Sequence, residues 1–245
     1  MRVIPIFLLI SFLCLNVRAD EISDELVALG YIEKEVPTIG SDAWSAANRS
    51  YPSLYVEKGQ SLSVRKATSE ETDPGQVIFD SGSIKYIGID RGEFGGGLYI
   101  DTVKPDAKPF FKGNIRALFP INNDLYIVTG LAHMGFSGGA IHVIRNYREP
   151  SIPEQVTLLP DAPEAISIDK SWRGNNNFLI AGHSSLMIFV PDHTLEIVKY
   201  DTFWSSLYPS SIVEYKKSYI IGIRSGIAVV TPSYGTSEVR YFVPN

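Results

Sequence analysis

Two short segments carry the residue types that could activate a serine nucleophile. Residues 135–139 (Gly-Phe-Ser-Gly-Gly) match the pattern Gly-x-Ser-x-Gly, and residues 182–186 (Gly-His-Ser-Ser-Leu) match it except at the last position. Such a serine needs a histidine base, an orienting carboxylate and a turn that leads from a strand into a helix. Both serines are instead followed by apolar runs typical of strands, at 140–145 and 186–190. We therefore interpret both segments as tight turns and predict no catalytic residue in them.

The histidines offer a second chemistry, the binding of a metal ion. His133 and His183 fall in corresponding loops between strands, where Asp90 or Glu93 could join them in a mixed site. The sequence contains no His-x-x-x-His pair, and two solvated loop histidines are the simpler interpretation. We therefore expect no bound metal and no cofactor.

The first 19 residues have the features of an export signal. Arg2 precedes an apolar run from Val3 to Val17, and the segment ends at Ala19, a small residue suited to signal-peptide cleavage. The run is shorter than the roughly 20 residues that span a bilayer. We predict that residues 1–19 are a cleaved signal peptide and that the protein is periplasmic or secreted. An uncleaved anchor is the alternative.

Cleavage would change what the chain can do. It removes Cys14, the single cysteine, so the mature chain could use no thiol nucleophile, thiolate zinc site or disulfide. It also removes two arginines and no acid, which lowers the formal net charge from −5 to −7. An acidic protein is a poor partner for nucleic acid or anionic lipid. We expect no nucleic-acid partner and no membrane span in the mature chain.

Secondary-structure elements after the signal must position the chemistry-bearing residues. Residues 20–35 have the apolar spacing of a short helix, with Ile22, Leu26 and Leu29 on one face, and the stretch to residue 53 has the composition of a linker. From residue 54 onward the sequence predicts about 18 short strands and no helix. The expected class is therefore all-β with a short N-terminal helix.

The strand region contains four similar units. Each has a strand led by an aromatic residue, a glycine-containing turn and a second apolar strand, and a third strand comes after them. The units begin at Tyr86, Tyr126, Phe178 and Tyr219. Their anchor positions, at the start of the second strand, are 97, 139, 185 and 226, which are 42, 46 and 41 residues apart. Another strand precedes each of the last three units, which predicts four strands in each repeat.

This pattern resembles the β-propeller repeat proteins over residues 54–245. The resemblance is loosely to kelch-like blades, whose glycine pair has counterparts in Thr129-Gly130 and Ala181-Gly182. It implies one domain of four or five blades. The strands at 54–56 and 62–66 would then pair with the C-terminal blade or contribute to a fifth. A β-sandwich is the alternative architecture.

In a propeller, the loops between the second and third strands of each blade share a face with the links between blades. We refer to this face as the loop face. Glu164 and Asp201 are expected on it. So are the candidate binding residues, which are Asp90, Arg91, Glu93, His133, Met134, Phe136, Asp161, His183, Trp204, Tyr208 and Arg224.

Two functions remain open for this face. The first is a non-enzymatic binding module for a protein partner, in which this protein could act as an inhibitor or neutraliser of that partner. Met134 and Phe136 are apolar residues on a long loop, and Trp204 and Tyr208 could anchor a partner. These two aromatic residues could equally cover the junction between blades. The second is a carbohydrate-active hydrolase or lyase that uses carboxylates of the loop face, with a glycan as ligand.

Overall fold

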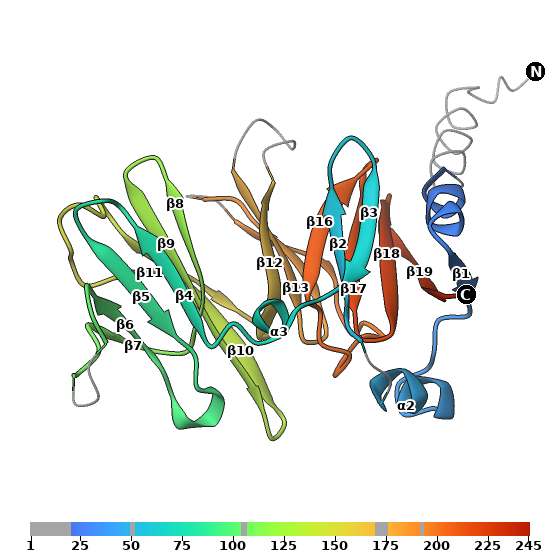
Figure 1. Cartoon of the computed structure of the whole chain (residues 1–245), viewed down its shortest axis with the longest axis horizontal. Helices are drawn as coiled ribbons and strands as arrows, with labels where there is room; N and C mark the ends of the chain where they lie inside the picture. The colour runs from blue at the N-terminus through green and yellow to red at the C-terminus, as the bar shows by residue number, and fades with distance from the viewer. Residues whose placement is uncertain (1–20, 50–51, 104–106, 170–175, 192–193) are drawn as a thin grey trace, which may run out of the picture.

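The computed structural model describes residues 21–49, 52–103, 107–169, 176–191 and 194–245. The proposed signal peptide, including Cys14, lies outside these residues. The described chain forms several small antiparallel sheets, which Figure 1 shows in a row along the longest axis of the molecule. The all-β class predicted from the sequence is confirmed.

Four sheets share one topology, in which four antiparallel strands pair with one another in chain order. The first contains β4 (Gln76–Asp80), β5 (Lys85–Ile89), β6 (Gly97–Ile100) and β7 (Phe111–Lys112). The second contains β8 (Ile115–Ile121), β9 (Asp124–His133), β10 (Phe136–Ile144) and β11 (Glu154–Leu159). The third contains β12 (Pro163–Asp169), β13 (Asn177–Gly182), β14 (Leu186–Phe189) and β15 (Leu195–Lys199). The fourth contains β16 (Ser211–Tyr215), β17 (Ser218–Ile223), β18 (Gly226–Ser233) and β19 (Thr236–Pro244).

The N-terminal region differs from the prediction. Residues 21–28 are helical, but the chain leaves the helix at Gly30, whose φ of 90° suits a residue without a Cβ. It then forms β1 (Tyr31–Lys34), which pairs antiparallel with β19 at the edge of the fourth sheet. The predicted helix was therefore too long. The partner strand of β1 lies at the other end of the chain, so local periodicity could not reveal the pairing.

The predicted linker also contains a helix, α2 (Asp42–Arg49). The Ser41 hydroxyl accepts a hydrogen bond from the backbone N–H of Trp44 at 3.2 Å, which caps the first turn. The Trp44 indole donates to the carbonyl of Phe203 at 3.0 Å and fixes the helix to the body of the protein. This helix was not predicted because its eight residues carry too few large apolar side chains for a clear periodicity.

The two strands left over from the four units form a separate hairpin, β2 (Leu54–Lys58) and β3 (Leu62–Lys66). This hairpin packs against β16 and β17 rather than pairing with β19, whose edge is taken by β1. From β3 the chain passes through a single helical turn, α3 (Ser69–Thr72), and Figure 1 shows it crossing to the first sheet at the other end of the molecule. A capping box between Thr68 and Glu71 stabilises this turn.

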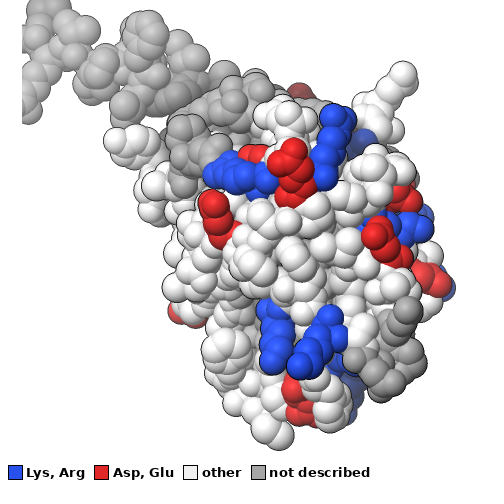
Figure 2. All heavy atoms as spheres, turned by 90° about the vertical axis from the view of Figure 1, so that its left-hand side faces the viewer, with Lys and Arg blue, Asp and Glu red and all other residues white. Residues whose placement is uncertain are grey.

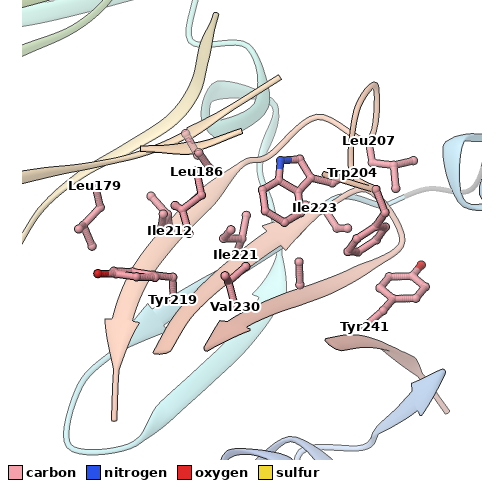
Figure 3. Close-up of a cluster of buried hydrophobic side chains, with 14 of the residues drawn as sticks. Leu179, Leu186, Trp204, Leu207, Ile212, Tyr219, Ile221, Ile223, Val230 and Tyr241 are labelled. Atoms are coloured by element: carbon pink, nitrogen blue, oxygen red, sulfur yellow. The ribbon is translucent and has the colours of Figure 1, made fainter. Parts of the chain in front are cut away.

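The core lies between the faces of successive sheets. Along β9, Leu125 and Ile127 face a cluster shared with the first sheet, whereas Tyr126 and Val128 face a cluster shared with the third. This alternation results from the two-residue period of a strand. The inner strands of the sheets are nearly continuous apolar runs because both of their faces are buried. Figure 3 shows the cluster between the third and fourth sheets.

Candidate functional site

Part of the predicted loop face is hollowed into a cavity of about 330 Å³, which we call the polar cavity. Asp90 comes directly after β5 of the first sheet, Arg116 lies on β8 of the second and Glu164 on β12 of the third. Tyr208 belongs to the link that leads to the fourth sheet, and Asp73 comes directly after α3. Segments far apart in the sequence thus meet at one place, and the chain between β3 and β4 forms part of its wall.

Asp90 and Arg116 form an ion pair inside the polar cavity. The Arg116 Nη1 lies 2.5 Å from the Asp90 Oδ2, and both side chains are largely buried. The other oxygen of Asp90 accepts a hydrogen bond from the backbone N–H of Gly92 at 2.8 Å. Asp90 is therefore charge-compensated and holds the β5–β6 loop against the second sheet. Arg116 was not predicted. The pairing of β8 with β9 is irregular between Ile115 and Ala117, which pack into different core clusters, so simple alternation along the strand does not place the Arg116 side chain.

A histidine–carboxylate pair lies at the third sheet. The Nδ1 of His183 is 2.8 Å from the Oε1 of Glu164, and this hydrogen bond raises the pKa of His183 against the opposing effect of burial. This hydrogen bond to Glu164 orients the imidazole ring of His183. The Oε2 of Glu164 is buried and accepts no hydrogen bond from the described residues. A buried acceptor in this state costs about 1–3 kcal/mol, which a ligand with a hydrogen-bond donor would recover.

Tyr208 presents an aromatic ring at the edge of the polar cavity. It is half-exposed, and its φ of 49° lies in the left-handed region, where a tyrosine is uncommon. The guanidinium of Arg224 lies over its ring at 4.4 Å, and the same guanidinium donates to the carbonyl and the side-chain oxygen of Asn48 at 2.9 Å. The predicted residues Tyr208 and Arg224 are thus brought together and are anchored to α2.

Beside the polar cavity three large apolar side chains project into solvent. Phe94 of the short 3₁₀ turn Gly92–Phe94 is 85% exposed, and Met134 and Phe136 at the β9–β10 turn are 91% and 61% exposed. We call these three residues the apolar tip. Glu93 and His133 join the two loops, with the Glu93 Oε2 2.7 Å from the His133 Nε2. Arg91 precedes the same turn and is exposed.

Trp204 does not belong to the accessible surface. Its indole is fully buried between the third and fourth sheets, where Figure 3 shows it above Ile221 and Ile223, and its Nε1 donates to the carbonyl of Gly182 at 3.2 Å. The prediction of Trp204 as a binding residue was therefore wrong. It covers a junction between sheets, which was the other role open to it.

Asp161 is buried as well, with only 1% of its surface exposed. Its carboxylate accepts hydrogen bonds from the backbone N–H of Ser184 and the hydroxyl of Ser185, both at 2.7 Å, and from the hydroxyl of Ser137. The serines of the two Gly-x-Ser-like segments therefore surround a buried carboxylate rather than a histidine base. The prediction that Asp161 binds a ligand at the surface was wrong, because these contacts hold it inside the protein.

Within the part of the chain that the structure describes, no three His, Cys, Asp or Glu side chains gather as metal ligands would. Its helices are also too short or too polar for any of them to cross a membrane. No protein-family model matches the sequence, and a search of curated proteins finds no relative of it.

Proposed function

We propose that this protein is an exported, non-enzymatic binding module that holds a protein partner on its loop face. The observation that carries the proposal is the apolar tip. Phe94, Met134 and Phe136 expose large side chains on two loops that Glu93 and His133 link together. Large apolar groups held in solvent are costly to keep and are typical of interaction sites.

The polar cavity supports the same proposal. Interfaces commonly combine a few apolar anchors with a polar region that fixes the orientation of the partner. Here Leu131 and Ala132 of β9 line the polar cavity, and Met134 and Phe136 come shortly after them in the chain, so apolar and polar contacts are adjacent. The cavity would accept a polar side chain of the partner while the apolar tip is covered.

The charge distribution is compatible with such an interface. Figure 2 shows the end of the molecule beside the first sheet, where Lys and Arg lie in small groups with Asp and Glu and large areas carry neither. Neither sign of charge forms an extensive surface at this end of the molecule.

We further propose that the four sheets are blades of a β-propeller and that the β2–β3 hairpin is an incomplete fifth blade. Their common topology and their face-to-face packing support this architecture. An experimental structure in which the four sheets pack without radiating from one axis would contradict it.

The proposed function is tested with paired variants. Partners are captured from the exported fraction of the native host, identified, and titrated against the wild-type protein and the Met134→Ser/Phe136→Ser variant. We expect at least a tenfold loss of affinity, because truncating an interface anchor commonly costs about 2 kcal/mol. The matched control is Ile152→Ser/Leu158→Ser, which removes two apolar side chains of similar exposure elsewhere.

Equal affinities in both variants would contradict the proposal. Glycan turnover by the wild-type protein that is lost in Asp90→Asn or Glu164→Gln would favour the carbohydrate-active alternative instead.

A further inference from the structure

A second hollow, larger than the polar cavity, lies at the edge of the fourth sheet that β1 forms. It has a volume of about 930 Å³ and is enclosed by three parts of the chain: β1 with β19, the helix α2, and the β2–β3 hairpin. In Figure 1 these elements lie together at the right-hand end, with α2 below the strands. This groove shares no lining residue with the polar cavity. Its size is that of a site for a small molecule.

The walls of the groove are mainly apolar. Tyr31, Tyr241 and Val243 line it from the β1–β19 edge. Ala43 and Ala46 line it from α2, and because their side chains are single methyl groups, the helix leaves the space open. Apolar walls with a few polar groups are typical of pockets that bind largely apolar ligands.

The wall formed by α2 is fixed in place. The Ser225 hydroxyl donates to the carbonyl of Ala47 at 2.8 Å, and Arg224 donates to the carbonyl of Asn48 at 2.9 Å. Together with the bond from Trp44 to Phe203, these contacts tie α2 to the fourth sheet and to the link before it. The helix is therefore unable to collapse into the groove without breaking these hydrogen bonds.

Positive charge dominates the lining. Lys34 and Lys66 are exposed, and neither forms an ion pair with a residue that the structure describes. Arg65 also lines the groove, but it is engaged by Glu57 at 2.8 Å and Glu71 at 2.5 Å. Two lysines are thus available to an anionic group against a single acid in the lining, Glu35.

We propose that this groove binds an anionic amphiphile of the long-chain fatty-acid class. The alkyl chain lies against the alanines of α2 and the aromatic residues of the β1–β19 edge, and the carboxylate lies at Lys34 and Lys66. Burial of the chain supplies most of the binding free energy, since apolar area contributes about 25 cal/mol per Å² removed from water. The lysines determine which head group is accepted.

The experiment measures the binding of oleate to the purified protein by displacement of a fluorescent fatty acid, below the micellar concentration. Methyl oleate tests the need for the charge, and hexanoate tests the need for the long chain. We expect one oleate for each chain, with methyl oleate bound about tenfold more weakly because it lacks a charge-assisted contact. Hexanoate should not compete at the same concentrations.

Variants locate the site. Lys34→Gln/Lys66→Gln should lower the affinity for oleate about tenfold, to that of methyl oleate, whereas Lys58→Gln/Lys112→Gln, two exposed lysines outside the groove, should leave it unchanged. Ala46→Trp should fill the groove and remove binding, and Ala43→Phe provides a second blocking variant. An unchanged thermal midpoint verifies that each variant is folded.

Equal binding of oleate and methyl oleate, or oleate binding that survives both blocking variants, would overturn the proposal. The protein is tested in the form that begins at Asp20, the predicted mature N-terminus. Another occupant gives a distinct result: if oleate does not bind and the protein forms dimers that Ala46→Trp disrupts, a second copy occupies the groove. This result would refute the fatty-acid assignment without affecting the proposed role of the loop face.

Discussion

The buried carboxylate of Asp161 offers a sharp test of how this fold is held together. We predict that Asp161→Asn destabilises the protein by about 2–4 kcal/mol. The carboxylate accepts from the hydroxyls of Ser137 and Ser185 and from the backbone N–H of Ser184. A hydrogen bond to a charged group contributes about 1.5–3 kcal/mol. An asparagine keeps one acceptor oxygen but carries no charge, so the bond on the side of the NH₂ group is lost or must reverse its direction, and the remaining bonds are no longer charge-assisted.

The surroundings of Asp161 leave no room for relaxation. A Cβ built at Gly182 would lie 2.5 Å from the Asp161 Oδ2 and 2.7 Å from the Ser185 hydroxyl, so the chain approaches the carboxylate as closely as a glycine allows. The side chain of an asparagine could not turn away without displacing this strand end. The full cost of the mismatched contact should therefore appear in the free energy of unfolding.

Urea denaturation followed by tryptophan fluorescence measures this cost. The midpoint should fall while the slope stays constant, because the same surface is exposed on unfolding. Ser185→Ala should cost less than Asp161→Asn, because it removes one donor and leaves the carboxylate with two. A loss below about 1 kcal/mol in Asp161→Asn would refute the assignment of a structural role.

Two further predictions concern other parts of the fold. Protonated His183 is stabilised by Glu164, with a smaller contribution from the charge of Asp161, so its pKa is raised on folding. This contribution to stability is fully present below the unfolded pKa of about 6.5 and is lost as the pH rises through the raised pKa of the folded state. Unfolding free energies from pH 5 to 8 should show this decline, and Glu164→Gln should flatten it. Gly30→Ala should cost about 1 kcal/mol in thermal unfolding, because an alanine at φ 90° is strained, whereas the same change at Gly59, where no positive φ is required, should cost less.

The sequence predicted the inner strands of the sheets well because they are buried on both faces. The apolar runs at Tyr126 and Phe178 are long and bounded by polar turns, and each became a central strand of its sheet. β1 escaped prediction because its identity depends on pairing with β19, a contact between the two ends of the chain. Four residues next to a helix carry no local signal strong enough to mark such an edge strand.

The candidate site was predicted unevenly for a related reason. Met134 and Phe136 were predicted to lie exposed on a long loop. Both are exposed, but the predicted loop was wrong, because β9 runs to His133 and β10 begins at Phe136, so the segment is the end of a long hairpin with a short turn. Trp204 was also expected on the loop face, but neighbouring sheets cover it, and the local sequence contains no information on that packing. Arg116 was missed because its partner, Asp90, lies on a different sheet.

The pairing of charges on the loop face weighs against acid–base catalysis there. Asp90 is held by Arg116, and Glu93 contacts His133 across the two loops. Carbohydrate hydrolysis needs two carboxyl groups that both reach the substrate and differ in proton affinity. One oxygen of Glu164, Oε1, is hydrogen-bonded to His183. The other, Oε2, is buried in the polar cavity and has no hydrogen-bond partner among the described residues. This atom is placed to accept a hydrogen bond from a donor of a bound partner.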